Sequence, residues 1–144
     1  MEETINIKPV DLVYSVYALG WTQEPKKTFK NIYNYLKPGG KFIWSWDHTI
    51  FTDIVYEDGK CTVKYSYHDE NPIHIKSWSG VGAHLIYRKT STWFKLQRDA
   101  GFEIEGYHEP EPEDLSHGHS DPSKYYSIQK AKLIPSTFIF VCKK

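Results

Sequence analysis

The spacing of apolar residues is most regular between residues 10 and 48, near the beginning of the sequence. Residues 10–16 (VDLVYSV) form a nearly continuous apolar run, which is typical of a strand that is covered on both faces. From Pro25 onward the apolar positions recur at i, i+3, i+4 and i+7, the spacing of one helix face, in Phe29, Ile32, Tyr33 and Leu36. The pattern therefore predicts a strand followed by an amphipathic helix.

The helix is expected to stop at Pro38-Gly39-Gly40, because proline cannot continue a helix and glycine accepts left-handed dihedral angles. Residues 41–46 (KFIWSW) are short, aromatic and well suited to a second strand. A strand, a helix and a strand in this order form a right-handed crossover unit, from which parallel α/β sheets are built.

The middle of the chain, at about 50–89, does not follow this alternating pattern. Asp58-Gly59 is a strong hairpin turn signal between the predicted strands 52–57 and 61–67. Residues 72–78 alternate and are expected to add a third antiparallel strand, and residues 84–88 also look extended. We interpret the block as an antiparallel β insertion that lies over the mouth of a crevice.

The last third of the sequence predicts a helix and a pair of strands. The helix runs from Ser91 or Thr92 to Ala100 and is stopped by Gly101. Strands are expected at 102–107 and 136–142, paired as an antiparallel hairpin across a long loop that is rich in Pro, Glu, His and Gly. The whole chain, 1–144, is expected to be a single domain of the α/β class.

Composition restricts the partners. Eighteen basic residues balance eighteen acidic ones, so binding to nucleic acid or to a membrane surface through bulk charge is not expected. The sequence contains no apolar run long enough to span a bilayer and no signal-peptide pattern, so we expect a cytoplasmic protein. Aromatic residues reach 16%, which is consistent either with a core of large rings or with an aromatic-walled pocket or interface.

Metal and hydrolase chemistry receive little support. Cys61 and Cys142 are not in a C-x-x-C pair, which argues against a metal knuckle or a redox motif. His117, His119 and Asp121 (H-G-H-S-D) offer metal-ligand types. Because no further ligand has suitable spacing, we interpret this segment as a solvated loop and predict no metal. The sequence has no nucleophile elbow either.

Sheet geometry predicts where a ligand would bind. In open parallel sheets the ligand crevice lies beyond the carboxyl ends of the strands. The first strand brings Ser15, Val16 and Tyr17 to that edge, and the second brings Trp46, Asp47 and His48. These two clusters are therefore expected to meet in one crevice.

These segments resemble the C-terminal half of a class I S-adenosylmethionine-dependent methyltransferase. The matching motifs are D-x-V-x-S at Asp11–Ser15, L-K-P-G-G at Leu36–Gly40 and L-x-x-x-A-G-F at Leu96–Phe102. The resemblance implies a partial Rossmann-like methyltransferase sheet, S-adenosylmethionine as cofactor and a small-molecule methyl acceptor. It also implies that Ser15, Val16 and Tyr17 bind the cofactor.

The glycine-rich turn that cradles the cofactor in this family is missing from the sequence, together with the first strands. Gly39-Gly40 cannot replace it, because this pair lies between a helix and a strand. We therefore expect a truncated methyltransferase fold that lacks a complete cofactor site on its own. The strand 11–16 would then have one bare edge, which predicts a homodimer through this strand or pairing with a missing N-terminal half.

His48 is the best candidate for a general base, with Asp47 to orient it; an ordinary surface histidine is the alternative. Trp21 and Trp46 are candidate walls of a substrate pocket, although core packing explains them equally well. His84, Tyr87 and Arg88 are candidates to reach the same pocket from the insertion. Two functions stay open: a methyltransferase whose substrate side lies in this chain, and a catalytically inactive binding or dimerisation module derived from the same fold.

Overall fold

A computed structural model describes residues 1–78, 80–114, 116 and 118–144. Its strands are β1 (Val10–Val16), β2 (Leu36–Asp47), β3 (Ile54–Glu57), β4 (Lys60–Val63), β5 (Ile73–Trp78), β6 (Val81–Leu85), β7 (Glu103–His108) and β8 (Thr137–Lys143). Its helices are the 3₁₀ turn η1 (Leu19–Trp21), α1 (Pro25–Tyr35), α2 (Thr49–Asp53), α3 (Thr90–Ala100) and α4 (Ile128–Ala131).

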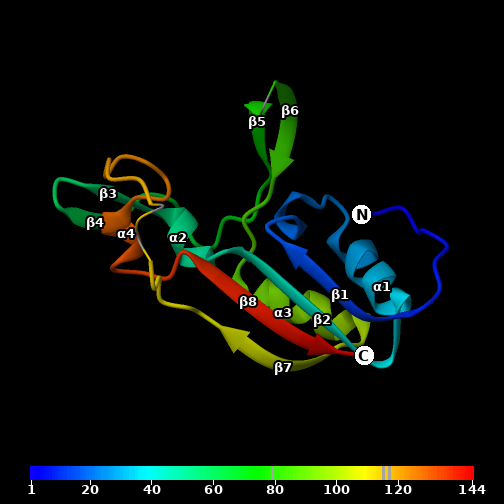
Figure 1. The fold of residues 1–144 in the computed structure, drawn as a ribbon. Helices are drawn as coiled ribbons and strands as arrows, with labels where there is room; N and C mark the ends of the chain where they lie inside the picture. The colour runs from blue at the N-terminus through cyan, green and yellow to red at the C-terminus, as the bar shows by residue number, and fades with distance from the viewer. Residues whose placement is uncertain (79, 115, 117) are drawn as a thin grey trace.

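The main sheet has four strands in the order β1-β2-β8-β7 (Figure 1). β1 and β2 are parallel and are joined by α1, whereas β8 runs antiparallel to both β2 and β7. This arrangement confirms the predicted α/β class, with a crossover unit and a C-terminal antiparallel pair. Because β8 lies between β2 and β7, it connects the two parts of the sheet through continuous hydrogen bonding.

The ends of the two long helices follow local sequence signals. Pro25 occupies the first turn of α1, where its missing N–H costs nothing. α3 ends at Gly101, whose φ of 109° lies in the left-handed region that favours glycine. The strand that was expected to begin at residue 41 begins at Leu36, because the backbone adopts an extended conformation immediately after α1. Gly39 then donates its N–H to the carbonyl of Lys144 at 2.9 Å.

One face of the sheet carries an aromatic core. Trp44 is 1% exposed and lies at its centre, stacked on Phe140 with ring centroids 5.1 Å apart. Trp93 of α3 meets the same indole edge-on at 5.1 Å, and Phe29 of α1 does so at 5.7 Å. The two helices therefore cover this face by packing on rings that alternate with outward-facing residues along β2 and β8.

A buried amide group lies inside this aromatic core. Gln97 of α3 is fully buried, and its Oε1 accepts hydrogen bonds from the Trp44 indole N–H at 3.0 Å and from the Cys142 thiol at 2.7 Å. Its Nε2 donates to the Trp93 carbonyl at 2.9 Å. Since buried polar groups need partners, Gln97 satisfies the donors of two strands and fixes α3 on the sheet.

The opposite face of the sheet is uncovered at the β1 end. Leu12, Tyr14 and Val16 are 50%, 74% and 67% exposed, and the neighbouring Ile43 of β2 is 37% exposed. Among the described strands, β1 pairs with β2 only, so it is also an edge strand. The expectation that both faces of β1 are covered is therefore wrong for this structure.

The middle block forms two separate hairpins. β3 and β4 pair as predicted around Asp58 and Gly59, both with positive φ. The first predicted strand is shorter than expected, because Thr52 and Asp53 belong to α2, and β4 ends at Val63.

β5 pairs with β6 and adds no third strand to the first hairpin, and the extended run of 84–88 is a strand only to Leu85. In Figure 1 most of the β5–β6 hairpin projects away from the body, while β3 and β4 lie with α2 and α4 at the carboxyl end of β2.

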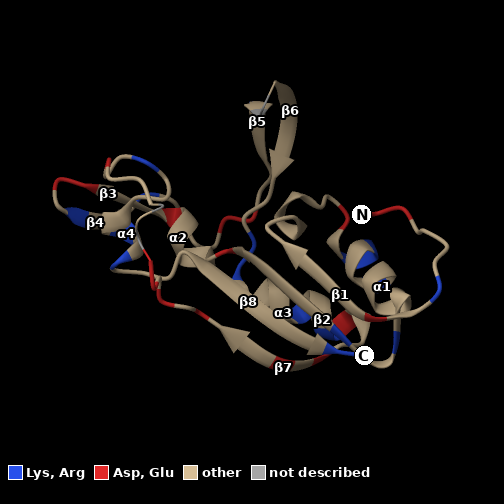
Figure 2. Cartoon of the chain, viewed as in Figure 1, with Lys and Arg blue, Asp and Glu red and all other residues tan. Residues whose placement is uncertain are grey.

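Charged residues are interspersed along the described chain (Figure 2). Among the described residues, two ion pairs link strands of the main sheet: Lys37 with Asp11 at 2.8 Å, and Lys41 with Glu105. Among the described residues, none of the helices combines the length and the apolar character needed to cross a bilayer.

We predict that Gln97→Met destabilises the protein. Methionine matches the length of glutamine but leaves the indole N–H of Trp44 buried without an acceptor, so the free energy of unfolding should fall by about 1–3 kcal/mol. The measurement is urea denaturation followed by tryptophan fluorescence. Lys95→Met, an exposed position on the same helix, is the control and should change stability by no more than about 0.5 kcal/mol. Equal stability of Gln97→Met and the parent protein would contradict the role assigned to Gln97.

Candidate functional site

The carboxyl ends of β1 and β2 meet in an aromatic cluster. The Tyr17 and Trp46 rings have centroids 6.0 Å apart, and Trp21 contacts Trp46 edge-on at 5.9 Å. The Tyr17 N–H donates to the carbonyl of Ser45 at 3.1 Å, which holds the turn after β1 against β2. Tyr17 has a φ of 48°, an unusual left-handed conformation for a non-glycine residue, and such strain is often found at functional turns.

Gly20 is required by the position of Trp46. A Cβ atom on Gly20 would lie 1.9 Å from Cε2 of the Trp46 indole, so the ring lies directly against the backbone of η1. The close approach fixes Trp46 at the end of β2 and explains why a glycine follows the first strand at this spacing.

A buried carboxyl group lies next to this aromatic cluster. Asp47, the last residue of β2, is 8% exposed and accepts a hydrogen bond from the Tyr126 hydroxyl at 2.7 Å. Burial raises the pKa of Asp47, although the Tyr126 hydrogen bond and the Lys130 charge act in the opposite direction. A carboxyl group with a raised pKa at the end of a sheet strand is typical of sites that transfer protons.

Four tyrosines surround this carboxyl group: Tyr17, Tyr87, Tyr125 and Tyr126. Burial raises the pKa of each of them, and the negative charge of Asp47 raises it further. Their hydroxyl groups therefore stay protonated and act as hydrogen-bond donors. We call Asp47 and these four tyrosines the Asp47 cluster.

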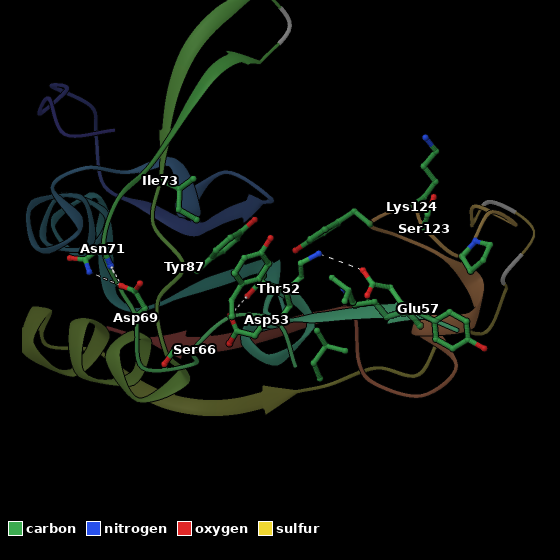
Figure 3. A pocket seen from close by; sticks show the side chains of 18 residues that line it. Thr52, Asp53, Glu57, Ser66, Asp69, Asn71, Ile73, Tyr87, Ser123 and Lys124 are labelled. Atoms are coloured by element: carbon green, nitrogen blue, oxygen red, sulfur yellow. Dashed lines mark hydrogen bonds and ion pairs between the residues drawn. The ribbon is translucent and has the colours of Figure 1, made fainter. Parts of the chain in front are cut away.

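A cavity of about 720 Å³ opens beside the Asp47 cluster (Figure 3). It lies between α2, β3, the segment 64–73 and the loop 122–125, and Tyr87 and Tyr125 belong both to its wall and to the Asp47 cluster. In Figure 3, Tyr87 and Asp53 lie near its centre, Asp69 and Asn71 at one end and Glu57 at the other.

Lys130 is the buried cation of this region. It is 3% exposed, and its ammonium group lies 3.7 Å from the centroid of the Phe51 ring and 4.8 Å from that of Tyr125. Burial lowers the pKa of Lys130 to about 8, while the nearby Cys61, Asp47 and Asp53 favour its charged form. A lysine with a pKa this close to neutrality can be charged or neutral near physiological pH.

His48 makes contacts that suit a structural role. It is 4% exposed, its Nδ1 accepts the N–H of Ile50 at 3.3 Å as the N-cap of α2, and its Nε2 lies 2.6 Å from Oε1 of Glu109. Both ring nitrogens are therefore engaged, and Asp47 does not orient the ring as expected. These contacts favour a capping role, and the assignment of His48 as a base stays a prediction.

His84 and Arg88 lie away from the Asp47 cluster. The exposed His84 ring faces His74 across the projecting hairpin at 4.8 Å, and its carbonyl accepts from the Gln23 side chain. The guanidinium of Arg88 is buried over the Trp93 ring and donates to the carbonyl of Thr22 at 2.9 Å. Of the three pocket candidates from the insertion, the structure brings only Tyr87 to the site.

Ser15 and Val16 point to different faces of the sheet. Ser15 lies opposite Trp44 on the helix-covered face, whereas the side chain of Val16 is exposed on the open face. The H-G-H-S-D segment shows no ligand arrangement in its described part: Asp121 accepts from Ser123, and His117 lies outside the described residues. No group of three or more His, Cys, Asp and Glu residues in the described part of the chain could hold a metal ion.

Sequence reasoning missed Asp53, Tyr125, Tyr126 and Lys130. Tyr125, Tyr126 and Lys130 lie in a segment without clear periodicity, and they reach Asp47 only because that segment folds back on α2. The Tyr-Tyr pair followed by a lysine was visible in the sequence, but nothing local indicated that Lys130 is buried or that the two tyrosines lie against Asp47.

Comparisons with known proteins agree on one fold. Residues 3–44 match the family model described as a methyltransferase domain. A putative S-adenosylmethionine-dependent methyltransferase from Listeria monocytogenes has a TM-score of 0.72 and 22% identity, over 99% of this chain and 64% of that one. An S-adenosylmethionine-dependent methyltransferase from Mesorhizobium loti has a TM-score of 0.73 and 23% identity, over 99% of this chain and 65% of that one.

A third similar structure is the complex between the Haloferax volcanii Trm112 methyltransferase activator and the putative methyltransferase. Its TM-score is 0.61 at 16% identity, over 99% of this chain and 57% of that one. No curated protein matches the chain significantly. The resemblance found in the sequence is thus confirmed at the level of the fold, and the chain spans less than two thirds of the length of these structures.

We predict that Asp47→Asn changes the pH dependence of stability. Because the pKa of Asp47 is raised in the folded state, the native protein binds more protons than the unfolded chain, so stability contributed by Asp47 falls as pH rises above its unfolded pKa. Asparagine keeps the acceptor for Tyr126 without the charge. Urea denaturation between about pH 4 and pH 7 should show Asp47→Asn gaining stability relative to the parent protein as pH rises. A stability difference that is constant with pH would show that Asp47 does not titrate in a buried setting.

Proposed function

We propose that this chain, whose fold is that of S-adenosylmethionine-dependent methyltransferases, supplies the acceptor side of a methyl-transfer site. The observation that carries the proposal is the meeting of the carboxyl ends of β1 and β2, where the Tyr17–Trp46 contact adjoins the buried Asp47 carboxyl group. In open α/β sheets this edge is where ligands bind.

The residues at the end of β1 fit one side of the cofactor, which supplies an electrophilic methyl group when bound. Val16 and Tyr17 present exposed apolar surface there, and the indole N–H of Trp46 is buried without a hydrogen-bond partner among the described residues. Such an orphaned donor fits a ligand that carries an acceptor. We assign Ser15, Val16 and Tyr17 to this side of the site.

Asp47 is the group best placed to take a proton from a methyl acceptor. Its carboxylate is held by the Tyr126 hydroxyl, and burial raises its pKa above the ordinary value, which strengthens it as a base. The rings of Trp21, Trp46 and Tyr87 then hold a small-molecule acceptor beside it. Since both nitrogens of His48 are engaged, His48 would have to leave Glu109 or the α2 cap to serve as the base.

The described chain supports only part of a cofactor site. None of its described strand-to-helix connections is the glycine-rich turn that would cradle the cofactor, and β1 has an open edge and an open face. We therefore propose that activity needs a further segment or chain placed along β1, and that cofactor binding by residues 1–144 alone is weak.

The open face also supports the second candidate function, a binding or dimerisation module. Exposed apolar side chains on an edge strand are a template for pairing with another chain. Two copies joined through Asp11 to Val16 would form one continuous sheet and cover Leu12, Tyr14 and Val16.

We predict that S-adenosylmethionine shifts the backbone amide resonances of Ser15, Val16 and Tyr17. Because only one side of the site is present, the dissociation constant should be about 1 mM or weaker. Two-dimensional NMR titration measures this, and Tyr17→Ala should reduce the shifts whereas Tyr65→Ala should not. Absence of shifts at these three residues would contradict the cofactor assignment.

We also predict that the chain self-associates at micromolar concentration. Sedimentation velocity should show a dimer, and Tyr14→Lys should yield a monomer because it places a charge on the open face at the pairing edge. Val63→Lys, which alters an equally exposed valine on β4, should leave the dimer intact. A monomeric parent protein under these conditions would exclude pairing through β1 and favour the first function.

A further inference from the structure

The cavity beside α2 has the size and walls of a small-molecule site. Its volume of about 720 Å³ lies within the usual range for ligand pockets. Its aromatic and apolar walls come from four separate segments of the chain: Tyr56, Tyr65, Tyr87, Tyr125, Ile54 and Ile73. Rings that face a cavity from several directions favour a flat, apolar ligand body.

The wall of this cavity includes a lysine that has no ion-pair partner among the described residues. Lys130 lines the cavity and is 3% exposed, and its ammonium group makes no hydrogen bond or ion pair with any described residue. The Phe51 and Tyr125 rings contact it. Ring contacts stabilise a cation but offer none of the acceptors that three N–H donors require.

A structural role does not account for this lysine. An unpaired buried charge destabilises a protein unless a partner compensates it. The groups that face Lys130 are Asp47 from β2, Asp53 from α2, Cys61 from β4 and Tyr125 from its own segment, and none lies within ion-pair distance among the described residues. The carboxyl groups of Asp47 and Asp53 are themselves buried with raised pKa values, which weakens their ability to act as counter-ions.

We propose that this cavity binds a planar aromatic molecule with an anionic oxygen, placed so that the oxygen pairs with the Lys130 ammonium. The oxygen supplies the missing acceptor, and the ring lies in the cavity against the wall that Tyr87 and Tyr125 form. A charge-assisted hydrogen bond inside a site of low dielectric is stronger than one in water, so the pair contributes both affinity and orientation.

This site adjoins the Asp47 cluster through Tyr87 and Tyr125. If the proposed function holds, the ligand of this cavity is the methyl acceptor, which identifies the acceptor class as aromatic acids that carry, apart from the anionic oxygen at Lys130, the protonated group from which Asp47 takes a proton. Only this identification rests on the proposed function, because binding of an aromatic anion requires neither the cofactor nor methyl transfer.

The test uses benzoate as the probe, with benzamide and benzylamine as its neutral and cationic counterparts. Titrations of the full 144-residue chain, followed by calorimetry and by NMR shifts at Tyr87 and Tyr125, should show that benzoate binds at least about tenfold more tightly than either. Lys130→Met should weaken benzoate binding by about tenfold or more, because it removes the charge and keeps the length of the side chain. Lys124→Met, an exposed lysine of the same cavity wall, should stay within about twofold of the parent protein.

Two further measurements separate binding from folding. Lys130→Met should have a melting temperature no lower than the parent protein, since the ammonium group that it removes makes no hydrogen bond or ion pair with a described residue and methionine keeps the contact with the Phe51 and Tyr125 rings. In the parent protein, benzoate affinity should fall as pH rises through about 8, where Lys130 loses its proton.

Tight binding of benzylamine, or benzoate affinity that is unchanged in Lys130→Met and constant with pH, would overturn the proposal. Because no cofactor is present in these titrations, their failure is distinguishable from a failure of S-adenosylmethionine to bind at residues 15–17.

Discussion

The structure depends on the packing of one aromatic layer against two helices. Trp44 lies at the centre, between Phe140 on the next strand, Trp93 on α3 and Phe29 on α1. Its indole N–H is satisfied inside the core by Gln97, so a single side chain fixes the angle between α3 and the sheet. Because large rings pack closely and bury much apolar surface, this layer stabilises β2 and β8 even though the other face of the sheet is open.

The same layer determines where the functional groups lie. β2 carries Trp44 into the core and then delivers Trp46 and Asp47 at its carboxyl end, two and three residues further on. Trp46 lies against Gly20, which brings the turn after β1 to the same place. The core and the candidate site are thus consecutive parts of one strand, and a change in the register of β2 would displace both.

The region around Asp47 collects ionisable groups that do not stabilise the fold by themselves. Asp47 and Asp53 are buried with raised pKa values, and Lys130 is buried with a lowered pKa. Each of these shifts means that burial disfavours the charged form. Groups kept in such an environment are typical of binding and catalytic sites, and here they adjoin the cavity beside α2.

Much of the fold could be predicted from the sequence because its signals are local. The apolar run of β1, the i, i+3, i+4, i+7 spacing of α1, the Asp58-Gly59 turn and the glycine that ends α3 each depend on a few neighbouring residues. The convergence of Tyr17 with Trp46 and Asp47 also followed from the sequence, since the carboxyl ends of adjacent parallel strands must meet.

Only the tertiary structure decided what surrounds those residues. Contacts between distant segments place β8 between β2 and β7 and direct the β5–β6 hairpin away from the body. The outer face of β1 is open because no described segment packs on it. The second ring nitrogen of His48 is engaged because Glu109 folds against it, and Lys130 became a buried cation because its segment returns to α2. Periodicity records which side chains are apolar, but burial of a polar side chain depends on residues far away in the chain, and a single sequence does not record those contacts.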